Sequence, residues 1–167
     1  MDKELNLVDL LQRRLIIYGY SVLDQGVSLG EDLQCLAILG TARRLMVRRI
    51  CIICTVPTYV RSYDDMRQYL SNLRRGISKL YARFPWWKEI GSFFVIFCEP
   101  LQFEAVRGRA YSFTDKTGLH MNVVLGVSFV DQVSHEFESA SSWGMSPSTS
   151  KPYGSLVAAL AEFREAH

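Results

Sequence analysis

Apolar residues recur along this chain with two different periods, and each period predicts a type of secondary structure. From Leu5 to Tyr18 they return every three or four positions, which predicts a helix that Asp2 is suited to cap and Gly19 to end. Residues 20–23 and 33–39 then predict two short strands on either side of a glycine-bearing turn.

A longer strand is predicted at residues 45–56, where the even positions are apolar apart from Arg48 and Pro57 ends the run. Three more strands are predicted at residues 91–98, 108–113 and 121–130, and the last of these alternates cleanly between apolar and small or polar residues.

The helix predicted with the clearest boundaries runs from Tyr63 to Tyr81. Ser62 precedes it as an N-cap, and Asp65 stands three residues later in an approximate capping box. Its apolar stripe includes Leu70, Leu73 and Ile77, so we expect these side chains to pack across the sheet.

The end of the chain combines a linker-like stretch with one more helix. Ser139–Ser155 is rich in Ser, Pro and Gly, which predicts a loosely packed segment, and a helix capped by Ser155 follows over residues 156–164. The pattern as a whole predicts one α+β domain over residues 1–167, with a small twisted antiparallel sheet and helices packed against it.

Composition excludes several classes of protein. With 167 residues, 49% of them apolar, and a net charge of +2, the chain can bury one core but carries no strong overall charge. No apolar run approaches the roughly 18 residues that cross a bilayer, and the amino terminus has neither a signal peptide nor the glycine that myristoylation requires. We therefore expect an intracellular protein that touches membrane only from the side.

Four cysteines raise the question of redox chemistry or zinc, because Cys51 and Cys54 form a C-x-x-C pair. The pair lies in a predicted strand, so the two side chains should point to opposite faces of the sheet. No second Cys or His pair completes a tetrahedral zinc site. Buried free thiols are the better interpretation, and no cofactor or metal is expected.

Several short motifs follow one another in a characteristic order. They are an Arg-Ser-Tyr turn at residues 61–63, a Pro-Trp-Trp-Lys segment at 85–88, Gly-Arg-Ala-Tyr at 108–111, a tryptophan at 143 and Phe-Arg-Glu at 163–165. In this order and wording they resemble the matrix proteins of rhabdoviruses, enveloped negative-strand RNA viruses. The chain lacks the Lys-rich arm and the Pro-Pro-x-Tyr motif of animal-infecting members, so it resembles a compact, divergent, plant-infecting branch.

The resemblance implies a structural protein and not an enzyme. It implies self-association through heterologous contacts beneath the envelope, binding to the viral nucleoprotein–RNA complex and to acidic phospholipids of the inner leaflet, and a role in virion assembly and budding. The viral glycoprotein tail is a further implied partner, and no small-molecule substrate is implied. The implied locations are the virion, the host cytoplasm, the inner face of host membranes and the nucleus.

The main candidate site is a basic face that could bind lipid headgroups or nucleocapsid phosphates, each cation contributing about 1 kcal/mol at an anionic membrane. The opposing interpretation is an ordinary solvated surface balanced by 17 acidic residues. The residues assigned to this face are Arg43, Arg44, Arg48, Arg49, Arg67, Arg74, Arg75, Arg107 and Arg109.

Two further sites are candidates for contact with membrane and with other subunits. Trp86, Trp87 and Lys88 combine aromatic rings with a cation, as interfacial segments do, although aromatic residues that lead into a strand are more often part of a core. Leu101 and Phe103, in a predicted loop over residues 99–106, could enter a neighbouring subunit together with Trp143. The alternative is that these side chains are buried in the core of their own domain.

Two other functions stay open. A degenerate metal-dependent nuclease would share a helix–strands–helix–strand core, and Glu31 and Asp32 could supply part of a metal site. The next strand, however, has Arg48 and Arg49 where a carboxylate and a lysine should stand. The other alternative is a non-enzymatic intracellular adaptor or scaffold. His120 and His135 have no catalytic or metal-binding partners at suitable spacing and are assigned no role.

Overall fold

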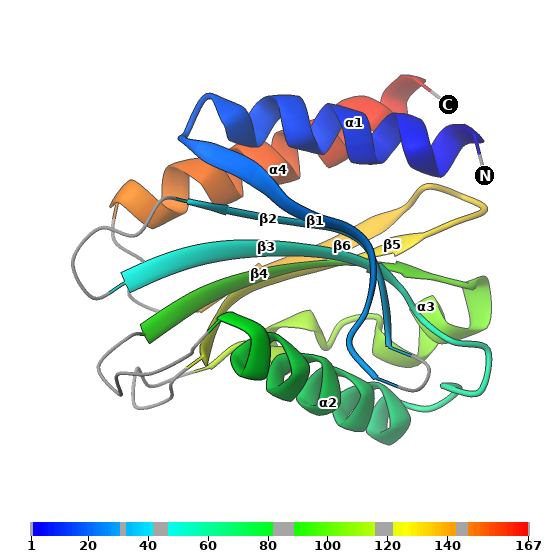
Figure 1. Cartoon of the computed structure of the whole chain (residues 1–167). Coiled ribbons are helices and arrows are strands. Elements are labelled where there is room, and N and C mark those ends of the chain that lie inside the picture. Colours follow the sequence, from blue (N-terminus) through cyan, green and yellow to red (C-terminus); the bar gives the residue numbers. More distant parts are fainter. Residues whose placement is uncertain are drawn as a thin grey trace.

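The protein, described here from a computed structural model, is a sheet covered by helices on both faces (Figure 1). The structure describes residues 2–30, 33–41, 47–81, 89–115, 122–142 and 147–166. One face is covered by α1 (Asp2–Ile16) and α4 (Pro147–Ala166); the other is covered by α2 (Tyr63–Tyr81), α3 (Pro100–Val106) and a 3₁₀ helix, η1 (Ala110–Phe113). The predicted α+β fold, a single small domain with helices packed on a sheet, is confirmed.

Across the described residues the sheet has six strands, which lie side by side in chain order. They are β1 (Tyr20–Ser28), β2 (Gln34–Thr41), β3 (Val47–Thr55), β4 (Glu89–Cys98), β5 (Asn122–Asp131) and β6 (Phe137–Ser141). The pairs β1–β2, β2–β3 and β5–β6 are antiparallel, although β6 was not among the predicted strands. The pairs β3–β4 and β4–β5 are parallel, so the antiparallel prediction is wrong for the centre of the sheet.

The parallel centre follows from the connections between these strands. Helix α2 carries the chain from the end of β3 back to the start of β4, and α3 with η1 does the same between β4 and β5. Crossovers of this length return the chain to the same end of the sheet, which makes successive strands parallel. The nearly continuous apolar run of β4 is typical of a parallel strand that is buried on both faces.

The two faces of β4 build the two halves of the core. Phe94 and Ile96 pack into the cluster beneath α2, where Leu73 and Ile77 of that helix are fully buried. Phe93 points to the other side, into the cluster formed with α1 and α4. The predicted packing of α2 across the sheet is confirmed.

Helix α2 begins at the predicted residue because its capping box forms. The Ser62 hydroxyl accepts a hydrogen bond from the Asp65 N–H at 3.1 Å, and the Asp65 carboxylate accepts one from the Ser62 N–H at 3.0 Å. These bonds satisfy backbone donors that the first turn of a helix leaves unpaired.

The strand predicted at residues 108–113 is wrong. Gly108 has a φ of +72°, which turns the chain, and η1 follows at once. The N–H of Ser112 donates to the Arg109 carbonyl at 2.9 Å, and that of Thr114 donates to the Tyr111 carbonyl at 3.2 Å. These local bonds use the backbone groups that a strand would have offered to the sheet.

The linker predicted at Ser139–Ser155 is also wrong, because β6 and the first half of α4 occupy its described part. Helix α4 starts at Pro147, nine residues before the predicted start at 156. Pro152 removes one intrahelical hydrogen bond, but Tyr153 beside it stacks on Phe93 at 5.5 Å between ring centroids and donates to the Ala140 carbonyl at 2.7 Å. Tertiary packing therefore stabilises a helix that local composition disfavours.

Removing the buried side chain at the centre of α2 should destabilise the whole domain. Leu73 is fully buried, so Leu73→Ala should lower the free energy of unfolding by about 2–5 kcal/mol, measured by urea denaturation. Ser71→Ala, on the exposed side of the same helix, is the matched control and should change it by less than about 0.5 kcal/mol. Equal effects of the two substitutions would contradict this packing.

The capping box should make stability depend on pH. Hydrogen bonds from the Ser62 side chain, and then from the backbone N–H groups of Arg61 and Ser62, lower the pKa of the Asp65 carboxyl. Its stabilisation is therefore complete above the unfolded-state pKa of about 3.9 and is lost as the pH falls through the lowered, folded-state pKa. Asp65→Asn should lower the melting temperature at neutral pH, and the difference from the parent should shrink in acid. A difference in melting temperature that stays constant with pH would contradict a stabilising role of the ionised Asp65 carboxylate.

Candidate functional site

The four cysteines do not form a reactive site. All four are buried and free, and Cys51 and Cys54 point into different halves of the core, as predicted. Burial raises the pKa of each of these two thiols to about 12. Both thiols therefore stay protonated at neutral pH, and thiolate chemistry requires the deprotonated form.

The residues assigned to a basic face fall into separate groups. Arg43 and Arg44 lie outside the described residues. Arg48 lies at the start of β3, where its Nε donates to the Thr41 carbonyl at 3.3 Å and its guanidinium lies 5.5 Å from the ring centroid of Tyr81. Arg49 is next to it on the same half-buried stretch of strand.

Arg74 is held inside the domain. Its guanidinium forms a two-point ion pair with the Asp115 carboxylate, at 3.2 and 3.1 Å, and both side chains are largely buried. The same carboxylate accepts the backbone N–H of Val124 on β5 at 2.8 Å. Arg74 therefore ties α2 to β5, and its charge is neutralised.

Arg107 is neutralised as well, although it is exposed. It pairs with Glu104 at 2.8 Å and with Glu136 across the loop, and its guanidinium lies 5.4 Å from the ring centroid of Phe103. Two carboxylates on one guanidinium leave little positive charge for a partner molecule.

Arg67 and Arg109 are brought together, although they come from different elements. Their guanidinium carbons lie 6.0 and 5.0 Å from the ring centroid of Tyr63, the first residue of α2. Within the described residues, neither has a carboxylate within ion-pair distance. Each cation–π contact holds a charge in place without neutralising it.

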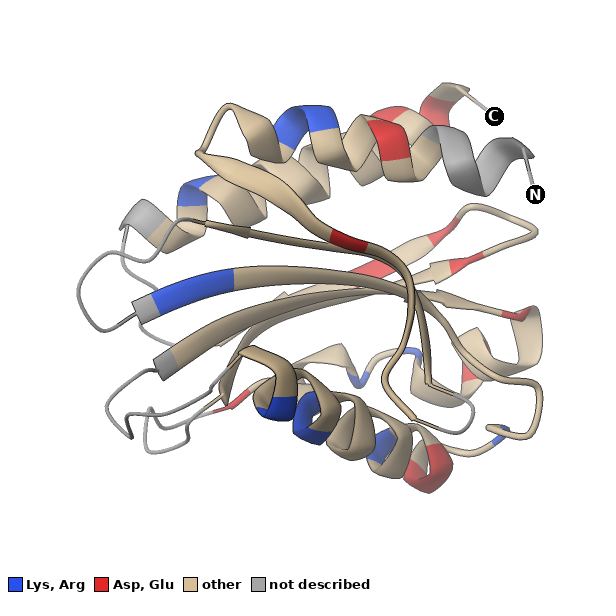
Figure 2. Cartoon of the chain, viewed as in Figure 1, with Lys and Arg blue, Asp and Glu red and all other residues tan. Residues whose placement is uncertain are grey.

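Arg67 also starts a row of exposed side chains along α2. Arg67, Ser71, Arg75 and Lys79 follow one another at intervals of four residues, so they form one ridge on the outer surface of the helix. Figure 2 shows this run of basic positions on α2. We call these four residues the basic ridge. Lys79 was not among the predicted site residues, although its spacing of four from Arg75 could have identified it.

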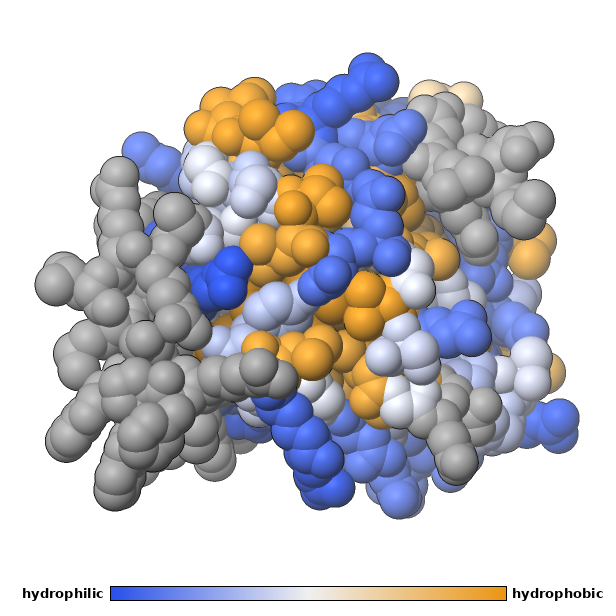
Figure 3. Space-filling view, in the orientation of Figure 1, coloured by the Kyte–Doolittle hydropathy of each residue, from blue (hydrophilic) through white to orange (hydrophobic). Residues whose placement is uncertain are grey.

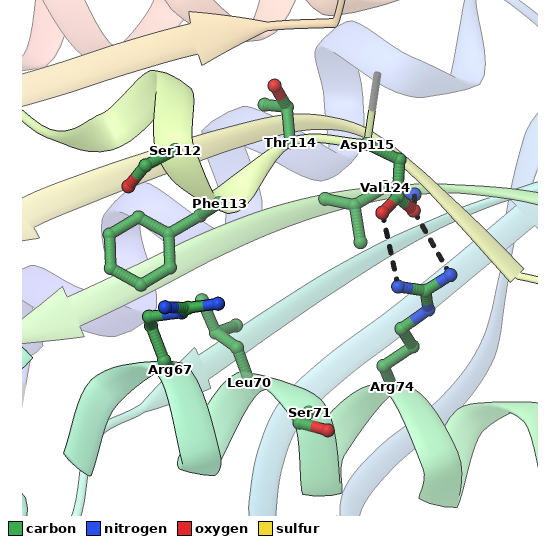
Figure 4. Close-up of a pocket in the computed structure, with 9 residues that line it drawn as sticks. All are labelled: Arg67, Leu70, Ser71, Arg74, Ser112, Phe113, Thr114, Asp115 and Val124. Carbon is green, nitrogen blue, oxygen red and sulfur yellow. Dashed lines mark hydrogen bonds and ion pairs between the residues drawn. The ribbon is translucent and has the colours of Figure 1, made fainter. Parts of the chain in front are cut away.

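A groove runs between α2, η1 and β5 beside the ridge, with a cavity volume of about 170 Å³ (Figure 4). Its apolar surface comes from Leu70, Phe113 and Val124. Arg67 and Ser71 belong to both the ridge and the groove, and the Arg74–Asp115 pair lies at the far end.

The structure corrects part of the predicted self-association site. Residues 100–106 form α3 and not a loop, because Pro100 occupies the first turn and Glu99 with Gln102 closes a capping box. Phe103 faces inward and is only 2% exposed, whereas Leu101 is 81% exposed. Trp143 and the membrane candidates Trp86, Trp87 and Lys88 lie outside the described residues.

A group of exposed apolar side chains lies far from the ridge. Ile16, Ile17, Tyr18 and Val22 surround the corner where α1 passes into β1, on the opposite face of the sheet from α2. Figure 3 shows apolar atoms gathered at this corner, at the upper left. In the part of the chain that is described, no helix is long and apolar enough to span a membrane.

The order α1–β1–β2–β3–α2–β4 matches the helix–strands–helix–strand order of the nuclease alternative. Its expected metal ligands are not assembled, however: β3 carries no carboxylate, and Glu31 and Asp32 lie outside the described residues. The described residues contain no group of three or more His, Cys, Asp or Glu side chains that could hold a metal ion.

Comparison with protein families, characterised proteins and solved structures found no match to this chain. The resemblance to rhabdovirus matrix proteins therefore stays a prediction. Within the described part of the chain, the geometry divides these basic residues into two that are ion-paired, Arg74 and Arg107, and four with no carboxylate in ion-pair distance: Arg67, Arg75, Lys79 and Arg109.

Arg74 and Arg75 should respond differently to the same substitution. Arg74→Met leaves the Asp115 carboxylate largely buried without its guanidinium, which should lower the free energy of unfolding by about 1–3 kcal/mol. Arg75→Met removes an exposed charge and should change it by less than about 0.5 kcal/mol. Urea denaturation of both variants measures the difference; equal values would mean that the ion pair does not anchor α2.

Proposed function

We propose that this protein is a non-enzymatic structural protein that binds the phosphates of a nucleic acid, bare or within a nucleoprotein complex, along the basic ridge. One observation carries the proposal: among the described residues, no carboxylate lies within ion-pair distance of the exposed cations of α2, whereas Arg74 and Arg107 are neutralised. A row of unpaired cations attracts an anionic partner even when the net charge is only +2.

The dimensions of the ridge suit a linear polyanion. From Arg67 to Lys79 the helix rises by about 18 Å, at 1.5 Å for each residue. A stacked strand advances by about 3.4 Å for each nucleotide, so the ridge spans about five successive phosphates. Binding would release the counterions that those phosphates hold, which makes the affinity depend strongly on salt.

Acidic phospholipid is the less favoured partner of the same cations. Interfacial membrane-binding surfaces combine cations with apolar side chains that enter the bilayer boundary. Here Ile16, Ile17 and Val22 lie on the opposite face of the sheet from the ridge, and among the residues described for α2, Leu80 is the one large apolar residue that is exposed. The roles in the envelope, in budding and in self-association that the matrix resemblance implies remain predictions beside this one.

The degenerate nuclease is a second candidate, because the order of helices and strands favours it. Both candidates bind nucleic acid phosphates, and they differ in whether the strand is cut. Metal-dependent cleavage by the purified protein, abolished by joint substitution of Glu31 and Asp32, would favour the nuclease. Binding without cleavage would favour the structural protein.

Neutralising two ridge cations should weaken binding to RNA. In a fluorescence titration with labelled RNA, Arg75→Gln/Lys79→Gln should lower the affinity about tenfold at low salt. If Arg67, Arg75, Lys79 and Arg109 each contact one phosphate, the logarithm of the affinity should fall with that of the salt concentration with a slope of about −3, and losing two contacts should make the slope shallower by about 1.4.

The matched control removes two exposed cations from the other face of the sheet, in Arg13→Gln/Lys151→Gln. It has the same net charge as the ridge variant, so an effect of net charge alone would lower its affinity equally. Equal affinities of both variants would contradict the proposal. A ridge variant that loses binding to vesicles of acidic phospholipid but not to RNA would identify membrane as the partner.

A further inference from the structure

The groove beside the basic ridge is lined in part by apolar side chains, which the binding of phosphates alone does not require. Leu70 and Phe113 are half-buried on its floor, and Val124 on β5 is 7% exposed. Polar groups stand around these apolar atoms: the Arg67 guanidinium and the Ser71 hydroxyl on one wall, and the Arg74–Asp115 pair at the end. The groove therefore suits a ligand with apolar faces and polar edges.

The groove adjoins the ridge, so a molecule bound along the ridge would also contact the groove. Arg67 and Ser71 line the groove with the same side chains that form the first half of the ridge. In Figure 4 the Arg67 guanidinium lies beside the Phe113 ring. A molecule whose phosphates follow the ridge would thus place the groups attached to its backbone next to the apolar floor.

We propose that the groove takes an unpaired base of a single-stranded nucleic acid whose phosphates lie along the basic ridge. This inference rests on the proposed function and names its partner more narrowly. A nucleobase has two apolar faces and a polar edge, and aromatic side chains bind it by stacking without selecting a sequence. A base in a duplex is already stacked and paired, so it cannot enter the groove without leaving the helix.

A charge-matched pair of probes separates the groove from the ridge. Labelled oligouridylate carries phosphates and bases, whereas inorganic polyphosphate of equal charge carries phosphates alone. The parent protein should bind oligouridylate roughly tenfold more tightly than polyphosphate at the same salt, and more tightly than a duplex RNA of the same length. We call the first of these ratios the base preference.

Two variants alter the groove without changing its charge. Ser71→Leu fills it with an aliphatic side chain, and Phe113→Leu keeps an apolar residue but removes the ring. Phe113→Leu should bring the base preference close to one while leaving polyphosphate binding intact. Ser71→Leu, at a position shared with the ridge, should also bring the ratio of the two affinities close to one, whatever its effect on polyphosphate binding itself. Gln68→Leu is the matched control, because Gln68 is exposed on α2 and does not line the groove; it should keep the preference.

The outcomes separate the two proposals. A loss of base preference in either groove variant, with the control unchanged, supports the inference; Phe113→Leu alone suffices, since its ring supplies the stacking. A parent protein without base preference, or groove variants that both keep it, overturns the inference and leaves the ridge proposal standing. If Arg75→Gln/Lys79→Gln binds both probes like the parent, the proposed function fails independently of the groove result.

Discussion

The burial of β4 on both faces is the constraint on which the rest of this structure depends. Phe93 and Phe94 are adjacent in the chain, so they point to opposite sides, and each is at most 1% exposed. A strand of this kind needs helices on both of its faces, because neither side can be left to water. The cover comes from α1 and α4 on one face and from α2 and α3 on the other, and the crossovers that bring α2 and α3 there make the centre of the sheet parallel.

A small set of buried polar contacts then sets the orientation of α2 on the sheet. Ser92 on β4 donates to the side-chain oxygen of Asn122 on β5, and the Asn122 amide donates to the Arg74 carbonyl at 3.3 Å. Because consecutive residues of a helix are about 100° apart, holding Arg74 toward Asp115 turns Arg75 to the outside. The arrangement that anchors the helix is therefore the one that exposes the ridge.

Local signals in the sequence were sufficient where the structure depends on neighbouring residues. The start of α2 follows from Ser62 and Asp65, and the burial of Cys51 and Cys54 follows from the apolar run around them. The sequence-based predictions were wrong where contacts between distant residues determine the local structure. Tyr153 packs so closely on Gly126 that a Cβ there would lie 2.5 Å from its ring, and this contact helps to hold α4 in a stretch whose composition resembles a linker. The parallel direction of the central strands likewise depends on the crossover connections, which no local sequence pattern predicts.

The candidate site shows the same limit, since a basic residue becomes a binding residue only if no carboxylate of its own domain reaches it. Asp115 neutralises Arg74 from a position 41 residues away, so no sequence window could have told Arg74 from Arg67 and Arg75. Arg107 has one local partner, Glu104, but its second partner, Glu136, is 29 residues away. The net charge of +2 is equally uninformative, because it sums charges that cancel inside the domain with charges that stay exposed on one helix. Ion pairing within the domain thus leaves the positive charge concentrated on one surface of a molecule whose net charge is close to zero. An anionic partner would be attracted by the local charge of the ridge and not by the net charge of the molecule.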